Sequence, residues 1–149
     1  MVKCQVILDA LERIAPRHLA EEWDNPGLLV GSPAQEVNRI LVALDVSDHV
    51  VHQALEQGAQ MIIAHHPLIF RPLKKLRTDL PLGHRLSVLL KHDIAVAAAH
   101  TNLDIAQGAS MMYWRRPSDF PSSRALSSPR SMRMARWRAW GALAACHRL

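Results

Sequence analysis

The chain has 149 residues, a formal net charge of +5, and hydrophobic residues at 49% of its positions. This length allows one domain with a substantial core but not two domains of ordinary size. Cys4 and Cys146 lie at opposite ends without CxxC spacing, which argues against a disulfide framework or a cysteine-based zinc site. We find neither a signal peptide nor an apolar run long enough to span a membrane, so we expect a cytoplasmic protein.

The positive charge belongs to one part of the sequence. Residues 1–108 contain 10 basic and 12 acidic side chains, a formal charge of −2, whereas residues 109–149 contain 8 arginines and one acid, a formal charge of +7. We therefore expect an α/β domain over 1–108 and a poorly ordered Arg/Trp-rich tail over 109–149. The overall pI is weak evidence for nucleic-acid binding by the domain. A basic arm that binds RNA is an alternative for the tail.

The first predicted element is an amphipathic helix. Val6, Ile7, Ala10, Leu11 and Ile14 recur at helical spacing, and Pro16 ends the pattern. The segment 25–27, Asn-Pro-Gly, favours a tight turn, since proline presets its own φ and glycine tolerates a positive φ.

The next segments alternate between strands and helices. Residues 39–46 form an apolar, β-branched run, and Ser47 is placed to cap a helix that Gly58 ends. Strands are predicted over 60–64 and 94–99, with a helix over 82–91 between them. This order predicts an α/β fold in which a parallel or mixed sheet has helices on both faces. Ligands of such sheets gather beyond the carboxyl ends of the strands.

Histidine and aspartate side chains follow two of these predicted strands. His65 and His66 come directly after residues 60–64, and His100 and Asp104 follow residues 94–99. Imidazole and carboxylate ligands suit Zn, Mn, Fe or Ni, so the pattern predicts a divalent-metal site. The alternative is a pair of loop histidines hydrogen-bonded to backbone. We expect the remaining histidines of the domain to lie on the surface: His18, His49, His52, His84 and His92.

A basic segment follows the histidine pair. Arg71, Lys74 and Lys75 come after Phe70 and could meet an anionic substrate such as a phosphate, although a solvated charged face is the alternative. The sequence contains no glycine-rich phosphate loop, no GxSxG and no catalytic Cys-His pattern.

Four motifs in order resemble the signatures of the Nif-three-like family, whose bacterial members are called GTP cyclohydrolase 1 type 2 homologs. They are residues 20–28 (AEEWDNPGL), 44–45 (LD), 65–68 (HHPL) and 100–104 (HTNLD). The resemblance covers about residues 3–108. It implies an α/β protein that binds two divalent cations and assembles as a ring, often a hexamer. It also implies that His65, His66 and Asp104 are metal ligands, and it leaves the role of His100 open.

The sequence departs from this family beyond Gly108. The resemblance implies two further ligands on a downstream His-x-x-x-Glu stretch, and no such stretch follows Asp104. Regrouping the codons allowed for residues 109–120 by one nucleotide permits Gly-Val-Asn-Asp-Val-Leu-Ala-Glu-Ala-Leu-Gly-Leu, an amphipathic helix similar to the family's continuation. We therefore expect the tail to be translated out of frame and the chain to be C-terminally truncated relative to the family.

The sequence thus predicts a divalent-metal-binding protein related to dinuclear-metal hydrolases, with an incomplete site and little activity. Its expected ligand is a nucleotide or another phosphorylated small molecule. A non-catalytic metal-binding or regulatory interaction protein is the alternative. Ring assembly is expected of intact relatives and is doubtful for this chain.

Overall fold

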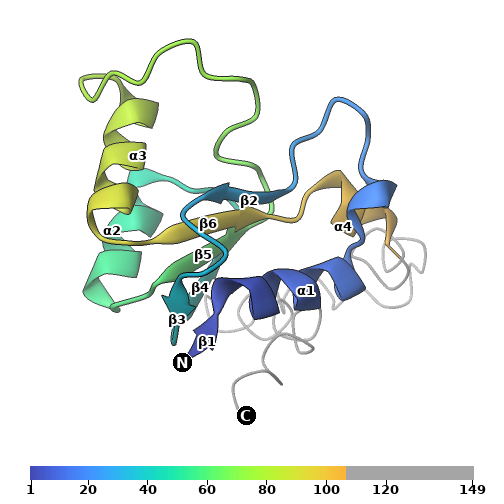
Figure 1. Cartoon of the computed structure of the whole chain (residues 1–149). Coiled ribbons are helices and arrows are strands. Elements are labelled where there is room, and N and C mark those ends of the chain that lie inside the picture. Colours follow the sequence, from blue (N-terminus) through green and yellow to red (C-terminus); the bar gives the residue numbers. More distant parts are fainter. Residues whose placement is uncertain (107–149) are drawn as a thin grey trace, which may run out of the picture. The chain divides into compact units, whose positions relative to one another are not determined.

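The structure is a computed structural model that describes residues 1–106. The chain divides into two compact units, Met1–Leu103 and Asp104–Leu149, and the elements of the first unit form the fold in Figure 1. The predicted tail, residues 109–149, lies outside the described residues. Within the described part, no helix is both long and apolar enough to cross a bilayer.

The first unit is built on a four-stranded mixed sheet in the order β2-β6-β5-β4. The strands β4 (Ile40–Ala43), β5 (Met61–Ala64) and β6 (Ala95–Ala98) run parallel, and β2 (Gly27–Val30) pairs antiparallel with β6. The predicted α/β class with a parallel or mixed sheet is therefore confirmed. The edge strand β2 was not predicted, because its short apolar segment follows directly on a turn.

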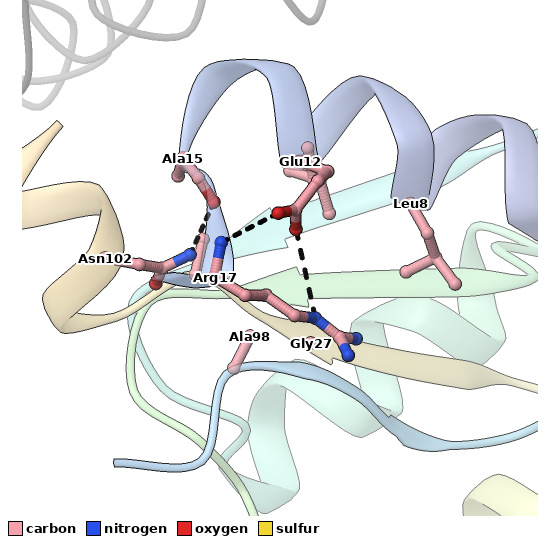
Figure 2. A pocket seen from close by; sticks show the side chains of 9 residues that line it. Leu8, Glu12, Ala15, Arg17, Gly27, Ala98 and Asn102 are labelled. Carbon is pink, nitrogen blue, oxygen red and sulfur yellow. Dashed lines mark hydrogen bonds and ion pairs between the residues drawn. The ribbon is translucent and has the colours of Figure 1, made fainter. Parts of the chain in front are cut away.

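Helices lie against both faces of this sheet. The helices α2 (Asp48–Glu56) and α3 (Pro81–Lys91) contribute Val51, Ala54, Leu86 and Leu89 to a core cluster that also contains Ile62 of β5. Side chains alternate between the faces of a strand, and Met61 and Ile63 are fully buried as well. Figures 1 and 2 show α1 (Cys4–Ile14) on the face opposite to α2 and α3.

The buried face of α1 differs from the predicted face at one position. Cys4, Ile7 and Leu11 are buried, at the i, i+3, i+7 spacing of one helix face, whereas Val6 is 48% exposed. In α3, the leucines Leu86, Leu89 and Leu90 lie at a spacing that predicts one apolar face, but only Leu86 and Leu89 are buried and Leu90 is exposed. In each helix the apolar stripe is narrower than its composition suggests.

The predicted helix ends are confirmed in α2. The Ser47 hydroxyl accepts a hydrogen bond from the Val50 amide at 3.3 Å. Gly58, with a positive φ of 60°, follows the end of the helix. Such a cap satisfies an amide that has no partner within the helix.

Smaller elements complete the chain as far as residue 105. A two-stranded antiparallel sheet pairs β1 (Val2–Lys3) with β3 (Glu36–Val37). A single turn of 3-10 helix, η1, spans Arg17–Leu19, and α4 spans Thr101–Ile105.

The turn near residue 25 lies slightly earlier than its composition suggests. The Asp24 amide donates to the Glu21 carbonyl at 2.9 Å, so the hydrogen-bonded turn is Glu21–Asp24. Gly27, which follows it, has the positive φ that the sequence predicted, at 103°. This early turn places the Asp24 carboxylate beside the carboxyl end of β6, where it binds His100.

Candidate metal centre

Three histidines meet at the carboxyl ends of the parallel strands β5 and β6. Ala43, Ala64 and Ala98 are aligned across the three parallel strands. Asp45, His66 and His100 each lie two residues beyond this row. Because neighbouring strands are about 4.8 Å apart, equal offsets from an aligned row bring these side chains together. The rings of His66 and His100 have centroids 5.6 Å apart.

His65 joins the same cluster from the position before His66. Its ring centroid lies 4.9 Å from that of His66 and 5.1 Å from that of His100. One possible ligand atom from each of the three histidines lies within 4.8 Å of the other two. This spacing allows the cluster to hold a metal ion.

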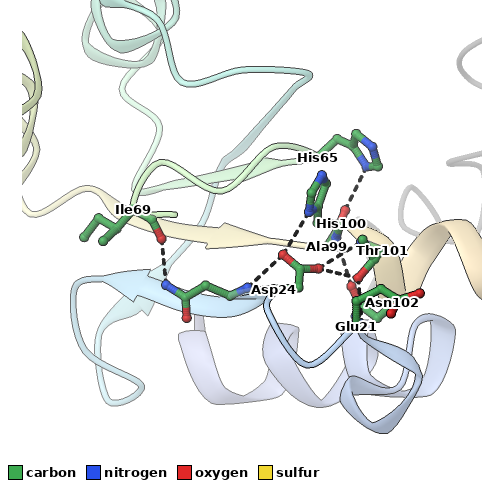
Figure 3. Close-up of polar contacts among 9 residues, drawn as sticks. Glu21, Asp24, His65, Ile69, Ala99, His100, Thr101 and Asn102 are labelled. Carbon is green, nitrogen blue, oxygen red and sulfur yellow. Dashed lines mark hydrogen bonds and ion pairs between the residues drawn. The ribbon is translucent and has the colours of Figure 1, made fainter. Parts of the chain in front are cut away.

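Each imidazole of the cluster is oriented by an acceptor at Nδ1. His65 Nδ1 donates to the Ala99 carbonyl at 3.0 Å, His66 Nδ1 to Asp45 Oδ1 at 2.7 Å, and His100 Nδ1 to Asp24 Oδ1 at 2.8 Å. These carbonyl and carboxylate oxygens can only accept, so the hydrogen lies on Nδ1 and the lone pair of the neutral ring on Nε2. Figure 3 shows two of these contacts, from His65 and His100. Metal-binding histidines in proteins are usually held in this way.

Asp24 is the most enclosed of these acceptors. Its side chain is 0% exposed, and its carboxylate also accepts hydrogen bonds from the Asn25 amide and from the amide and hydroxyl of Thr101. Burial works to raise the pKa of Asp24, but the hydrogen bonds from Thr101, His100 and Asn25 outweigh it and lower the pKa below its ordinary value. Asp24 is thus held as an anion beneath His100.

A second layer of contacts holds the segment that carries His100. The His100 amide donates to Asn102 Oδ1 at 2.9 Å, and Asn102 Nδ2 donates to the Ala15 carbonyl at 2.7 Å. Asn102 is the buried polar residue in this network, at 3% exposure. Its two hydrogen bonds fasten the end of β6 to the end of α1.

A small pocket adjoins this support, between α1 and the ends of β2 and β6 (Figure 2). The Arg17 amide donates to Glu12 Oε1 at 2.9 Å, and the Arg17 guanidinium lies against Gly27. A Cβ at Gly27 would lie 2.0 Å from Arg17 Nη2, and the φ of 103° is unfavourable for any other residue. Glycine at this position therefore allows arginine to close the wall of the pocket.

The predicted site residues can now be located. The structure brings His65, His66 and His100 within ligand distance of one another, and the sequence had left the role of His100 open. The assignment of His65 and His66 as metal ligands stays a prediction. Asp104 is partly buried in α4 and is the first residue of the second unit, so its place among the metal ligands stays a prediction. No role was predicted for Asp24 or Asp45, although they lie in the segments 20–28 (AEEWDNPGL) and 44–45 (LD). The equal offsets of Asp45, His66 and His100 appear only once the strands are aligned in the folded sheet.

The other histidines of the first unit lie outside the cluster, as predicted. All five are exposed: His18, His49, His52, His84 and His92. His52 and Glu56 have the His-x-x-x-Glu spacing, but they form an exposed contact on α2, with 3.5 Å between His52 Nδ1 and Glu56 Oε1. Arg71, Lys74 and Lys75 are exposed, and a role in binding an anionic substrate stays a prediction.

The fold and the cluster define a class of protein: a mixed-sheet α/β protein with a histidine cluster, able to hold a metal ion, at the carboxyl ends of its strands. The model of the DUF34/NIF3 (NGG1p interacting factor 3) family matches residues 2–116. The chain belongs to this family.

Relatives and solved structures agree with this assignment. The chain is 46% identical over 104 residues to a GTP cyclohydrolase 1 type 2 homolog from Halalkalibacterium halodurans, covering 70% of this chain and 28% of that protein. A Bacillus cereus protein related to NIF3 is 45% identical with a TM-score of 0.70, covering 73% of this chain and 30% of that one. A Staphylococcus aureus protein is 39% identical with a TM-score of 0.72, covering 76% and 33%. The chain thus spans less than a third of the length of the first curated relatives that it matches.

Proposed function

We propose that this chain binds a divalent cation through His65, His66 and His100. The observation that carries the proposal is that an oxygen acceptor engages Nδ1 of all three rings, so that coordination would use Nε2 in each case. Three neutral imidazoles suit Zn, Fe or Ni better than the hard cations Mg or Ca, and Mn fits only if an oxygen ligand such as Asp104 joins them. Asp104 remains the oxygen ligand that the sequence predicts.

The residues around the cluster are suited to a hydrolytic centre. A bound divalent cation would supply Lewis acidity and lower the pKa of a water molecule. The chain's own contribution is to fix the imidazoles and to place two carboxylates, Asp24 and Asp45, behind them. The side chain of His66 is 47% exposed, so a substrate can approach the cluster from that side.

The proposed activity is that of a metal-dependent hydrolase related to the GTP cyclohydrolase 1 type 2 homologs. Residues 105–149 contain no His-x-x-x-Glu stretch of the kind that would supply two further ligands. We therefore propose weak cation binding and little turnover. The proposed substrate class is a nucleotide or another phosphorylated small molecule. Ring assembly is proposed for intact relatives only.

Cobalt titration of the full chain tests the cation site. We expect the d–d absorption of protein-bound Co²⁺, and we expect His65→Ala, His66→Ala and His100→Ala each to lower the affinity at least about 10-fold. His52→Ala and His84→Ala are matched controls, because both residues are exposed histidines on helices. An equal loss in the controls, or no Co²⁺ binding by the wild-type chain, would contradict the proposal.

A non-catalytic, regulatory metal-binding protein is the second candidate, favoured by the family description, which names an interacting factor. A GTP assay on the metal-loaded chain separates the two functions. Turnover that disappears in His66→Ala and persists in His52→Ala supports the hydrolase. Cation binding without GTP or phosphate-ester turnover supports the second candidate.

A further inference from the structure

Two exposed aromatic side chains stand beside the histidine cluster. Trp23 is 59% exposed and Phe70 is 42% exposed. Their ring centroids are 5.8 Å apart at an interplanar angle of 61°, an edge-to-face arrangement. The centroid of His100 lies 6.3 Å from that of Trp23 and 6.4 Å from that of Phe70. Trp23, Phe70 and His100 thus form a continuous group of rings that reaches from solvent to the proposed cation.

The two loops that carry these aromatic rings are fastened to each other. Asn25 Nδ2 donates to the Ile69 carbonyl at 2.6 Å, directly beside Phe70 in the sequence. The residue before Asn25, Asp24, accepts hydrogen bonds from His100 and Thr101. Figure 3 shows the hydrogen bond to Ile69 and the Asp24 contacts in one view. Trp23 and Phe70 therefore stay exposed on anchored backbone.

Anchored, exposed aromatic rings are suited to stacking against a planar ligand. Exposed apolar side chains that form a contiguous patch often mark a binding site, whereas a single exposed apolar side chain does not. Stacking on an aromatic side chain contributes substantially to the binding of a base and tolerates different bases, because every base has a π-face. A small ligand fits better than a protein partner, because the rings lie directly against the histidines that would hold a cation.

We propose that Trp23 and Phe70 form a subsite for a planar heteroaromatic ring, such as a nucleobase, whose polar substituents face the histidine cluster. Arg71 is exposed and follows Phe70 in the sequence, and the proposal assigns to it the anionic group of the same ligand. The proposal rests on the proposed function, since the cation gives the ring its orientation. It adds that a planar ring is the part of the ligand that is recognised, and that Trp23 and Phe70 recognise it.

Equilibrium binding to the Co²⁺-loaded full chain tests the subsite with three probes: guanosine, guanosine monophosphate and ribose 5-phosphate. We expect both purine probes to bind and ribose 5-phosphate to bind about 10-fold or more weakly, because it has no ring to stack. We expect Trp23→Leu to weaken purine binding about 10- to 100-fold and Trp23→Phe to retain most of it. Leu76→Ala, at an exposed apolar position between β5 and α3, is the control and leaves binding unchanged.

Co²⁺ affinity, measured in parallel, separates the two proposals. If the wild-type chain and Trp23→Leu bind Co²⁺ equally, any loss of purine binding belongs to the stacking subsite. Unchanged purine binding by Trp23→Leu, equal binding of ribose 5-phosphate, or failure of all three probes with Co²⁺ bound would overturn the subsite and leave the cation site standing. Absence of Co²⁺ binding would overturn the proposed function itself. Tighter binding of a single-stranded oligonucleotide, with a strong salt dependence, would also overturn the small-molecule assignment.

Discussion

Nδ1 of His100 donates to Oδ1 of Asp24 at 2.8 Å, between residues 76 positions apart in the sequence. The contact joins the turn before β2 to the end of β6. These two strands are antiparallel neighbours in the sheet. It orients the imidazole and holds a buried negative charge next to the proposed cation. Asp24 is therefore the residue through which fold stability and cation affinity are most closely coupled.

Asp24→Asn is expected to weaken both properties. The amide nitrogen of asparagine faces hydrogen-bond donors, so at least one of the bonds to His100, Asn25 or Thr101 is lost. We expect a loss of about 2–3 kcal/mol in the free energy of unfolding and about a 10- to 100-fold loss in Co²⁺ affinity. Urea unfolding and cobalt titration measure the two effects.

Asp45→Asn is the matched control for that change. The Asp45 side chain is 61% exposed, so the free energy of unfolding is expected to change by no more than about 0.5 kcal/mol. Co²⁺ affinity is still expected to fall, because Asp45 orients His66. Equal destabilisation by the two substitutions would contradict the assigned roles.

Acidification is expected to remove the stabilisation that Asp24 supplies. Its pKa in the folded protein is below the ordinary value, because its hydrogen bonds outweigh burial. The unfolded chain takes up this proton near pH ~4, so the contribution is fully present above that pH. It is lost as the pH falls from there through the folded-state pKa. With EDTA present, the difference in unfolding free energy between wild type and Asp24→Asn should shrink between pH 6 and pH 3. A constant difference would argue against the lowered pKa.

Ile62→Ala is expected to destabilise the fold strongly. Ile62 is 0% exposed within the core cluster between the sheet and the helices α2 and α3. The lost burial and the cavity left behind should lower the free energy of unfolding by about 2–5 kcal/mol. Val42→Ala on the neighbouring strand is the control: Val42 is 43% exposed, and the expected change is below about 1 kcal/mol. Thermal or urea unfolding distinguishes them, and similar losses would contradict the described core.

Ser47→Ala is expected to lower the free energy of unfolding by about 1 kcal/mol, because the Val50 amide loses its hydroxyl acceptor. Ser47→Asp should retain the stability, since its carboxylate can accept the same bond and is favoured near a helix N-terminus. Equal free energies of unfolding for Ser47→Ala and Ser47→Asp would show that the capping hydrogen bond does not stabilise the helix.

The sheet could be predicted from the sequence where local signals and long-range pairing agree. Residues 61–64 and 94–99 are apolar on both faces, as buried parallel strands require, and Ser47 and Gly58 mark the ends of α2. The antiparallel strand β2 was not predicted, because its short segment has no clear strand pattern of its own. It is a strand only through its pairing with β6. The exposure of Val6 and Leu90 likewise depends on which side of a helix meets the sheet.

The site could be predicted only in part, for a similar reason. His65 and His66 stand out because they are adjacent, follow a strand and precede a proline. The role of His100 depends on the alignment of Ala64 with Ala98, and the roles of Asp24 and Asp45 depend on which strands are neighbours. Strand order is a property of the folded sheet and is not encoded in local spacing.

The aligned row Ala43–Ala64–Ala98 has a consequence for how the cluster comes apart. His65 and His66 follow β5 and His100 follows β6, so the three imidazoles converge only when these strands pair in the right alignment. A one-residue slip of β5 would turn His66 to the opposite side of the sheet. The colour of a protein-bound cobalt ion would therefore report on correct strand alignment, and it should fade together with the sheet during unfolding.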